Sequence, residues 1–154
     1  MTRSDNAGFS LMELMIVVAI VAILASIAYP AYTSSILKGK RAEGRAAIAE
    51  LIQQQERYLT QRDTYLQFTT NASGVTSPAG VPFKVFSGSN LAGSAYLLSA
   101  DRCPLVGTTT LALLSECVRV IASPVNPDPL AGDLRMTSTG FRDCNGTNSS
   151  LCWK

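Results

Sequence analysis

The fold is decided by residues 8–13, Gly-Phe-Ser-Leu-Met-Glu, which lead directly into a long apolar run. No charged residue occurs from Leu14 to Leu37, and at about 1.5 Å per residue a helix of this length measures roughly 36 Å. That length exceeds the hydrocarbon core of a bilayer, so the run is predicted to span a membrane. Glu13 lies at the head of this span, where an unpaired carboxylate costs about 2–3 kcal/mol if it enters hydrocarbon. We therefore expect a positively charged partner for Glu13.

The leader before Phe9 differs from a secretory signal. It is short and polar, and no small-residue cleavage site follows the apolar run. Cleavage between Gly8 and Phe9 would instead create a cationic α-amine at Phe9 and leave the apolar segment on the mature chain. The amine of a neighbouring subunit would then be a natural partner for Glu13.

Residues 8–20 resemble the class III signal of type IV prepilins, because the Gly/Phe junction, the glutamate four residues after the phenylalanine and the uninterrupted apolar run occur together. The resemblance implies cleavage after Gly8 by a dedicated prepilin peptidase and N-methylation of Phe9. It also implies polymerisation with other pilin subunits through Glu13 and the apolar helix, at an inner-membrane pilus assembly platform. The alternative is a single-pass anchor in which the glutamate occurs by chance.

The resemblance implies an α+β pilin fold, in which a long N-terminal helix packs on a small antiparallel β-sheet head. We expect a prepilin leader at residues 1–8 and a transmembrane and polymerisation half of the helix at 9–36. An amphipathic half-helix is expected at 37–62, and a head with a C-terminal disulfide region at 63–154. Pro30 lies inside the helical pattern, where it removes a backbone hydrogen bond, so a helix bend is predicted there.

The second half of the helix has apolar residues largely at helical spacing. This stripe is predicted to be buried under the head, while the charged face is solvated or meets neighbouring subunits. The stripe consists of Ile36, Leu37, Ala42, Ala46, Ile48, Leu51, Ile52, Tyr58 and Leu59.

Three segments of the head have the character of β-strands: residues 95–100, 117–123 and 133–138. In the second and third of these, apolar and polar residues alternate with a period of two, which indicates strands with one buried face. We expect the three strands to form an antiparallel meander that lies on the half-helix.

Two further segments are predicted to be loops. Residues 68–90 are rich in Thr, Ser, Gly, Asn and Pro, and we expect a loop there with one short strand at 81–86. Pro124, Pro127 and Pro129 follow the second strand of the meander. Because proline cannot donate to a sheet ladder, they predict a connecting loop before the third strand.

Four cysteines in a small domain favour an oxidising compartment, and we expect disulfides among Cys103, Cys117, Cys144 and Cys152. Spacing favours Cys103 with Cys117 across a hairpin and Cys144 with Cys152 in the tail, because neighbouring strand ends bring Cα atoms within about 7 Å. The alternative joins Cys117 to Cys152, as the C-terminal loops of related pilins are tied to the sheet. A zinc site is not expected, since the chain has no Cys-x-x-Cys pair and no histidine.

Basic residues follow the apolar run closely, namely Lys38, Lys40, Arg41 and Arg45. The positive-inside tendency would place the C-terminal part in the cytoplasm. The cysteines and the prepilin resemblance favour the opposite topology. We therefore expect a single-pass inner-membrane protein with a periplasmic head, which then enters an extracellular pilus.

The composition argues against an enzyme. The chain has no histidine to act as a catalytic base, no glycine-rich phosphate loop and no carboxylate motif, so neither catalysis nor a cofactor is expected. The expected function is that of a structural subunit of a type IV pilus that serves adhesion, twitching motility or DNA uptake. One alternative is a minor pilin that acts as a DNA-binding module in natural transformation. A further alternative, a type II secretion pseudopilin, is disfavoured by the cysteine-closed C-terminus.

DNA binding would need a basic patch with an aromatic side chain for stacking. Tyr96 or Trp153 is the predicted aromatic residue. The candidate cations are Lys84, Arg102, Arg119, Arg135, Arg142 and Lys154. The simpler interpretation is that these are scattered surface charges.

Overall fold

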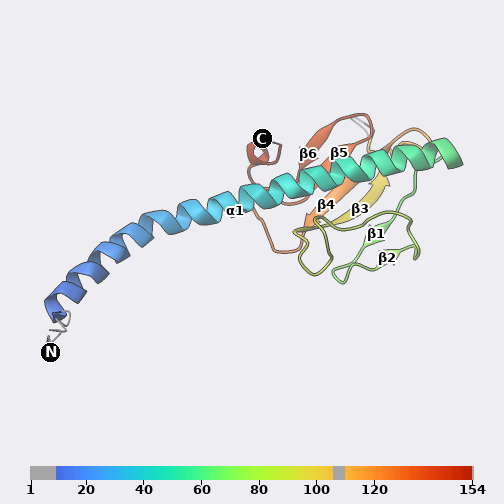
Figure 1. The fold of residues 1–154 in the computed structure, drawn as a ribbon. Helices are drawn as coiled ribbons and strands as arrows, with labels where there is room; N and C mark the ends of the chain where they lie inside the picture. The colour runs from blue at the N-terminus through green and yellow to red at the C-terminus, as the bar shows by residue number, and fades with distance from the viewer. Residues whose placement is uncertain (1–9, 106–109, 154) are drawn as a thin grey trace, which may run out of the picture. The chain divides into compact units, whose positions relative to one another are not determined.

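A computed structural model describes residues 10–105 and 110–153 of the 154-residue chain. It has the α+β architecture expected of a pilin, with one long N-terminal helix followed by antiparallel strands (Figure 1). The elements are α1 (Leu11–Arg62), β1 (Thr69–Thr70), β2 (Thr76–Ser77), β3 (Tyr96–Arg102), β4 (Val118–Pro124), β5 (Leu134–Thr137), β6 (Arg142–Cys144) and the 3₁₀ helix η1 (Ser149–Leu151). The predicted end of the helix at residue 62 is confirmed.

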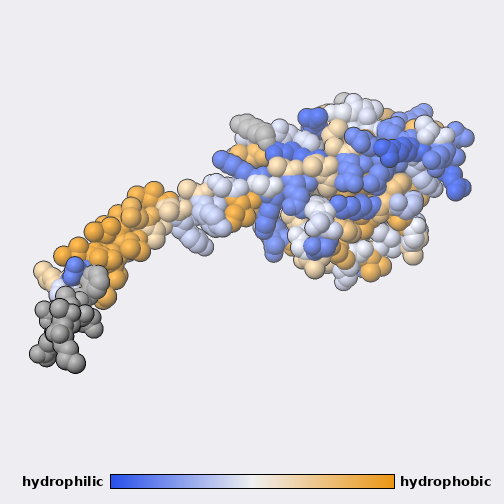
Figure 2. Space-filling model, in the orientation of Figure 1, coloured by the Kyte–Doolittle hydropathy of each residue, from blue (hydrophilic) through white to orange (hydrophobic). Residues whose placement is uncertain are grey.

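The chain divides into two compact units, which meet between Lys38 and Gly39 within α1. In the N-terminal unit, apolar side chains cover the surface of the helix (Figure 2). The helix is long and apolar enough to cross a membrane, and none of its most apolar stretch is buried inside the protein. Pro30 lies within the continuous helix.

Hydroxyl groups in the N-terminal unit are bonded inside the helix. Ser26 Oγ donates to the carbonyl of Ile23 at 2.7 Å, and Thr33 Oγ1 donates to the carbonyl of Pro30 at 3.0 Å. Because hydrocarbon offers no hydrogen-bond partners, such local bonds make these polar side chains compatible with a membrane.

In the C-terminal unit, one face of α1 is buried against the sheet. Ala42 and Ala46, which were predicted to belong to this face, are exposed, so that part of the prediction is wrong. The buried face is shifted and also contains polar residues, because Arg41 and Gln55 have partners in the head. It consists of Arg41, Gly44, Ala47, Ile48, Leu51, Ile52 and Gln55.

The head contains a four-stranded antiparallel sheet in the order β3-β4-β5-β6. Val118, Val120 and Ala122 of β4 are completely buried in one cluster with Ile48 and Leu51 of α1, which confirms the predicted meander. Alternate residues of the strands point to the other face, which we call the outer face of the sheet. The fourth strand, β6, was not predicted, because three residues are too few to show an alternating pattern.

Two loop predictions need correction. The region 68–90 contains a small antiparallel pair, in which Thr69 of β1 lies opposite Ser77 of β2, and no strand at 81–86. Phe86 makes only an isolated bridge to Leu97. Pro124 is the last residue of β4 and lies opposite Tyr96, so the connecting loop begins after it.

Gly44 allows a close approach of the helix to Tyr96 of β3. A Cβ atom at this position would lie 2.8 Å from Cδ2 of Tyr96. The Tyr96 ring is 2% exposed, so it has little room to move away. Gly44 therefore sets the distance between α1 and β3.

We predict that Gly44→Ala destabilises the head, by about 1–3 kcal/mol, because overpacking a well-filled core has that cost. Gly39→Ala is the matched control, since a Cβ there meets no atom within 4 Å. Alanine favours a helix over glycine by up to about 1 kcal/mol, so Gly39→Ala should stabilise. Thermal melts of the full-length protein in detergent measure both effects, and a stabilising Gly44→Ala would contradict this account of the interface.

Candidate functional site

Glu13 lies in the first turn of α1, while the predicted processing residues Gly8 and Phe9 lie outside the described residues. The backbone N–H of Glu13 donates to Ser10 Oγ at 3.2 Å, and the N–H of Leu14 donates to the Ser10 carbonyl at 3.1 Å. Ser10 is therefore the N-cap of the helix, and Glu13 occupies the position that an acidic residue takes in a capping box. This local role was not predicted, although the Ser-x-x-Glu spacing is its signature.

A buried ion pair joins α1 to the loop between β4 and β5. Arg41 Nε donates to Asp128 Oδ2 at 2.7 Å, and Arg41 Nη2 donates to Asp128 Oδ1 at 2.9 Å. Both side chains are about 95% buried. The hydrogen bonds from Arg41 hold the pKa of the Asp128 carboxyl below its ordinary value, and the same pair raises the pKa of Arg41. Both groups therefore stay charged at neutral pH.

Asp128 also organises the backbone that follows it. Its Oδ1 accepts the N–H groups of Leu130 and Ala131, each at 3.3 Å. The carbonyls of this same segment accept hydrogen bonds from the C-terminal loop, from Gly146 to Ala131 and from Asn148 to Leu130. The C-terminal loop thus depends on a segment that Arg41 holds against the helix.

Two more contacts fix the C-terminal loop. Arg45 Nη1 donates to the carbonyl of Cys152 at 3.2 Å. A Cβ on Gly146 would lie 2.3 Å from the Leu130 carbonyl oxygen, so only glycine fits there.

The structure contains the two local disulfides, Cys103–Cys117 and Cys144–Cys152. Their Cα atoms are 5.6 and 6.4 Å apart, respectively. The first closes the connection between β3 and β4, and the second closes the C-terminal loop. No cysteine is free.

Two of the predicted DNA-binding cations are paired with acids on the outer face of the sheet. Arg119 Nη2 lies 3.3 Å from Asp101 Oδ2, and Arg135 Nη1 lies 3.5 Å from Asp143 Oδ2. Their charges are therefore partly compensated within the head.

Two further predicted cations, Lys84 and Arg102, have contacts of their own. Lys84 Nζ is 4.0 Å from Glu50 Oε2 and 5.4 Å from the centre of the Phe86 ring. Arg102 Nε donates to the Ala112 carbonyl at 2.8 Å. Lys154 lies outside the described residues.

Arg142 and Trp153 form the cation and aromatic pair that the sequence predicted for a nucleic-acid site. The Arg142 guanidinium lies 5.3 Å from the centre of the Trp153 ring, and Arg142 is exposed. Trp153 Nε1 donates to the Asp143 carbonyl at 3.0 Å, which fixes the indole. The stacking role predicted for Tyr96 is wrong, because its ring is buried in the core.

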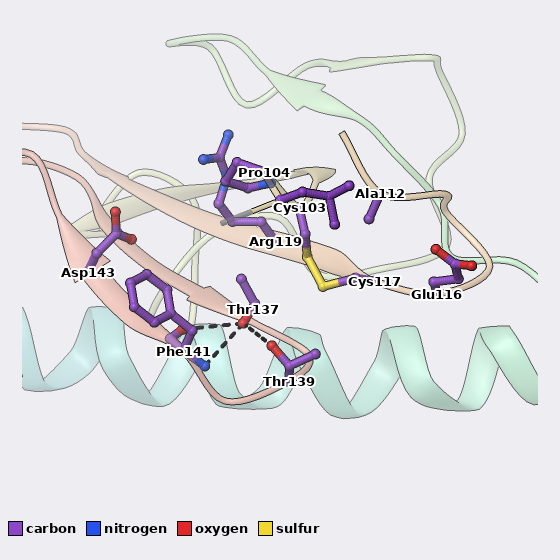
Figure 3. A pocket seen from close by; sticks show the side chains of 11 residues that line it. Cys103, Pro104, Ala112, Glu116, Cys117, Arg119, Thr137, Thr139, Phe141 and Asp143 are labelled. Atoms are coloured by element: carbon purple, nitrogen blue, oxygen red, sulfur yellow. Dashed lines mark hydrogen bonds between the residues drawn. A yellow bond between two sulfur atoms is a disulfide. The ribbon is translucent and has the colours of Figure 1, made fainter. Parts of the chain in front are cut away.

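A groove lies on the outer face of the sheet, between the β3–β4 connection and the β5–β6 hairpin (Figure 3). Its volume is about 560 Å³. The residues that line it are Cys103, Pro104, Leu105, Ala112, Glu116, Cys117, Arg119, Thr137, Thr139, Phe141 and Asp143. We call it the disulfide groove. Nothing in the sequence predicted it, because its walls come from segments that only the sheet brings together.

Residues 30–109 match the family model described as "Type IV minor pilin ComP, DNA uptake sequence receptor". Residues 3–29 match the prokaryotic N-terminal methylation motif, in agreement with the class III signal. No curated protein matches the chain. Since the first match covers just over half of the 154 residues, the chain belongs to the type IV pilins, in the ComP family of minor pilins.

Proposed function

We propose that this pilin is a minor subunit that captures DNA for uptake. The observation that carries the proposal is the family match over residues 30–109, since the family is described as a DNA uptake sequence receptor. The match favours this function over a type II secretion pseudopilin. Type IV pilins are structural filament subunits, so the activity proposed here is binding and not catalysis.

The pair of the exposed Arg142 and the half-buried Trp153 supports the proposal. A guanidinium group binds a phosphate in a bidentate manner, and the contact with the indole of Trp153 positions the Arg142 guanidinium for it. Arg119 and Arg135 are expected to contribute less to phosphate binding, because each already has an acidic partner. The DNA backbone is therefore expected to pass over the C-terminal region of the head.

The proposal is tested by the salt dependence of DNA binding to the full-length protein in detergent. The logarithm of the binding constant should fall linearly with the logarithm of salt concentration, and Arg142→Gln should reduce the slope by roughly one phosphate contact, about 0.7–0.9. Lys84→Gln is the control, because the contacts of Lys84 are with Glu50 and Phe86. DNA binding that is absent, or that is independent of salt, would contradict the proposal.

We propose that the same chain is anchored in the inner membrane with its head in the periplasm before it joins a pilus. The leader at residues 1–8 is then removed after Gly8, and Phe9 is methylated. The apolar residues 9–36 mediate polymerisation, while residues 37–62 support the head. The disulfides support this topology, because disulfides persist in oxidising compartments.

The role of Glu13 in assembly can be separated from its role at the helix start. Glu13→Gln removes the charge but keeps a residue that suits the capping box, so we expect normal membrane insertion and few subunits in filaments. Ser10→Ala is the matched control, since it removes the cap and keeps the carboxylate. The ratio of filament-bound to membrane-bound subunit in sheared-pilus preparations measures the difference. Wild-type incorporation of Glu13→Gln would exclude charge pairing as the basis of assembly.

A further inference from the structure

The walls of the disulfide groove are largely apolar. The Cys103–Cys117 disulfide and Pro104 form one part of the lining, and Phe141 of the β5–β6 hairpin forms another (Figure 3). The disulfide holds Cys103 and Cys117 together, with their Cα atoms 5.6 Å apart. This restraint on one part of the lining reduces the ordering that is needed to bind a ligand.

Phe141 is the most exposed aromatic side chain of the head among the described residues, at 65%. Its backbone is held on both sides by Thr137: the Thr137 N–H donates to the Phe141 carbonyl at 2.9 Å, and the Phe141 N–H donates to Thr137 Oγ1 at 3.1 Å. The hairpin therefore presents a large apolar ring to solvent at a defined place. Because Phe141 is exposed and also lines the groove, its ring can contact a ligand that enters the groove.

The charges around the groove disfavour a phosphate as its occupant. Its lining contains Arg119 together with two carboxylates, Glu116 and Asp143. Arg119 is paired with Asp101, and Asp143 is paired with Arg135, so both charges are partly compensated. With Glu116 as a further carboxylate, the lining offers an anion little attraction.

The lining nevertheless offers polar groups to a neutral ligand. Arg119 lines the groove, but its Nε is buried, so a ligand in the groove does not reach that donor. The hydroxyl of Thr139, which also lines the groove, can donate to a carbonyl oxygen of a ligand. The carboxylates of Glu116 and Asp143 can accept from an amino or imino group. The ligand that fits these features has flat apolar faces and an edge with both donors and acceptors.

We propose that the disulfide groove receives a single unstacked nucleobase of the bound DNA. The inference rests on the proposed function, and it assigns the phosphate contacts and the base contact to different places. Arg142 binds the backbone, while Phe141 stacks on the base and the polar side chains of the lining contact its edge. The groove, of about 560 Å³, is large enough to hold one base without its pairing partner. Phe141 is thus expected to contact the base and to make no contribution to phosphate binding.

The test compares two single-stranded oligonucleotides of equal length, one of mixed sequence and one in which every base is replaced by an abasic site. Both carry the same phosphates, so backbone binding alone gives equal affinities. Full-length wild-type protein in detergent should bind the intact strand roughly ten-fold more tightly or better, as expected for aromatic stacking. Phe141→Ala should lose most of this preference and keep the salt dependence.

Two variants control for indirect effects. Phe141→Leu keeps apolar volume but removes the aromatic faces, so it should also lose the preference. Leu130→Ala removes an exposed apolar residue, 44% accessible, from a loop that does not line the groove, and it should retain the preference. The fluorescence of Trp153, the single tryptophan, reports whether each variant is folded.

The outcomes distinguish this inference from the proposed function. Salt-dependent binding with equal affinity for intact and abasic strands would overturn the base site and leave DNA capture standing. An undiminished preference in both Phe141 variants would overturn the assignment of the base to this groove. Absence of any DNA binding would overturn both proposals.

Discussion

The structure of the head depends on the buried ion pair between Arg41 and Asp128. The two residues are 87 positions apart in the sequence, and their pairing fastens the β4–β5 loop to the helix. The C-terminal loop is in turn bonded to the β4–β5 loop, because the N–H groups of Gly146 and Asn148 donate to its carbonyls. A buried pair of this kind gives little net stability compared with apolar packing, but removal of one partner leaves a charge uncompensated. The pair therefore fixes one arrangement of helix, loop and C-terminus.

The two units of the chain have surfaces that suit different surroundings. Up to Lys38 the helix is apolar on its surface and bonds its own hydroxyl groups, as a segment in a membrane or in a filament core must. After Gly39 the same helix buries one face under a small sheet, and two disulfides close the connections that the sheet leaves long. The apolar helix surface and the packed head thus lie in separate parts of the chain.

Much of this fold follows from local patterns. The helix end at Arg62 and the strand around Val120 could be predicted, because helical spacing and strand alternation show which face of each element is buried. The role of Arg41 could not, since in the sequence it is one of several basic residues after an apolar run. The disulfide groove and the position of Phe141 depend on which strands become neighbours, and no local pattern encodes that.

The central role of the ion pair is tested by the free energy of unfolding of the full-length protein in detergent as a function of pH, for wild type and Asp128→Asn. The pKa of Asp128 is lowered in the folded state, so its ionised form stabilises the head above its unfolded pKa, and this stability is lost as the pH falls through the folded pKa. At pH 7 we predict that Asp128→Asn is less stable by about 3–5 kcal/mol, with a difference that shrinks in acid. If the two proteins were equally stable at pH 7, or if their stability differed by the same amount at every pH, the ion pair would not have this central role.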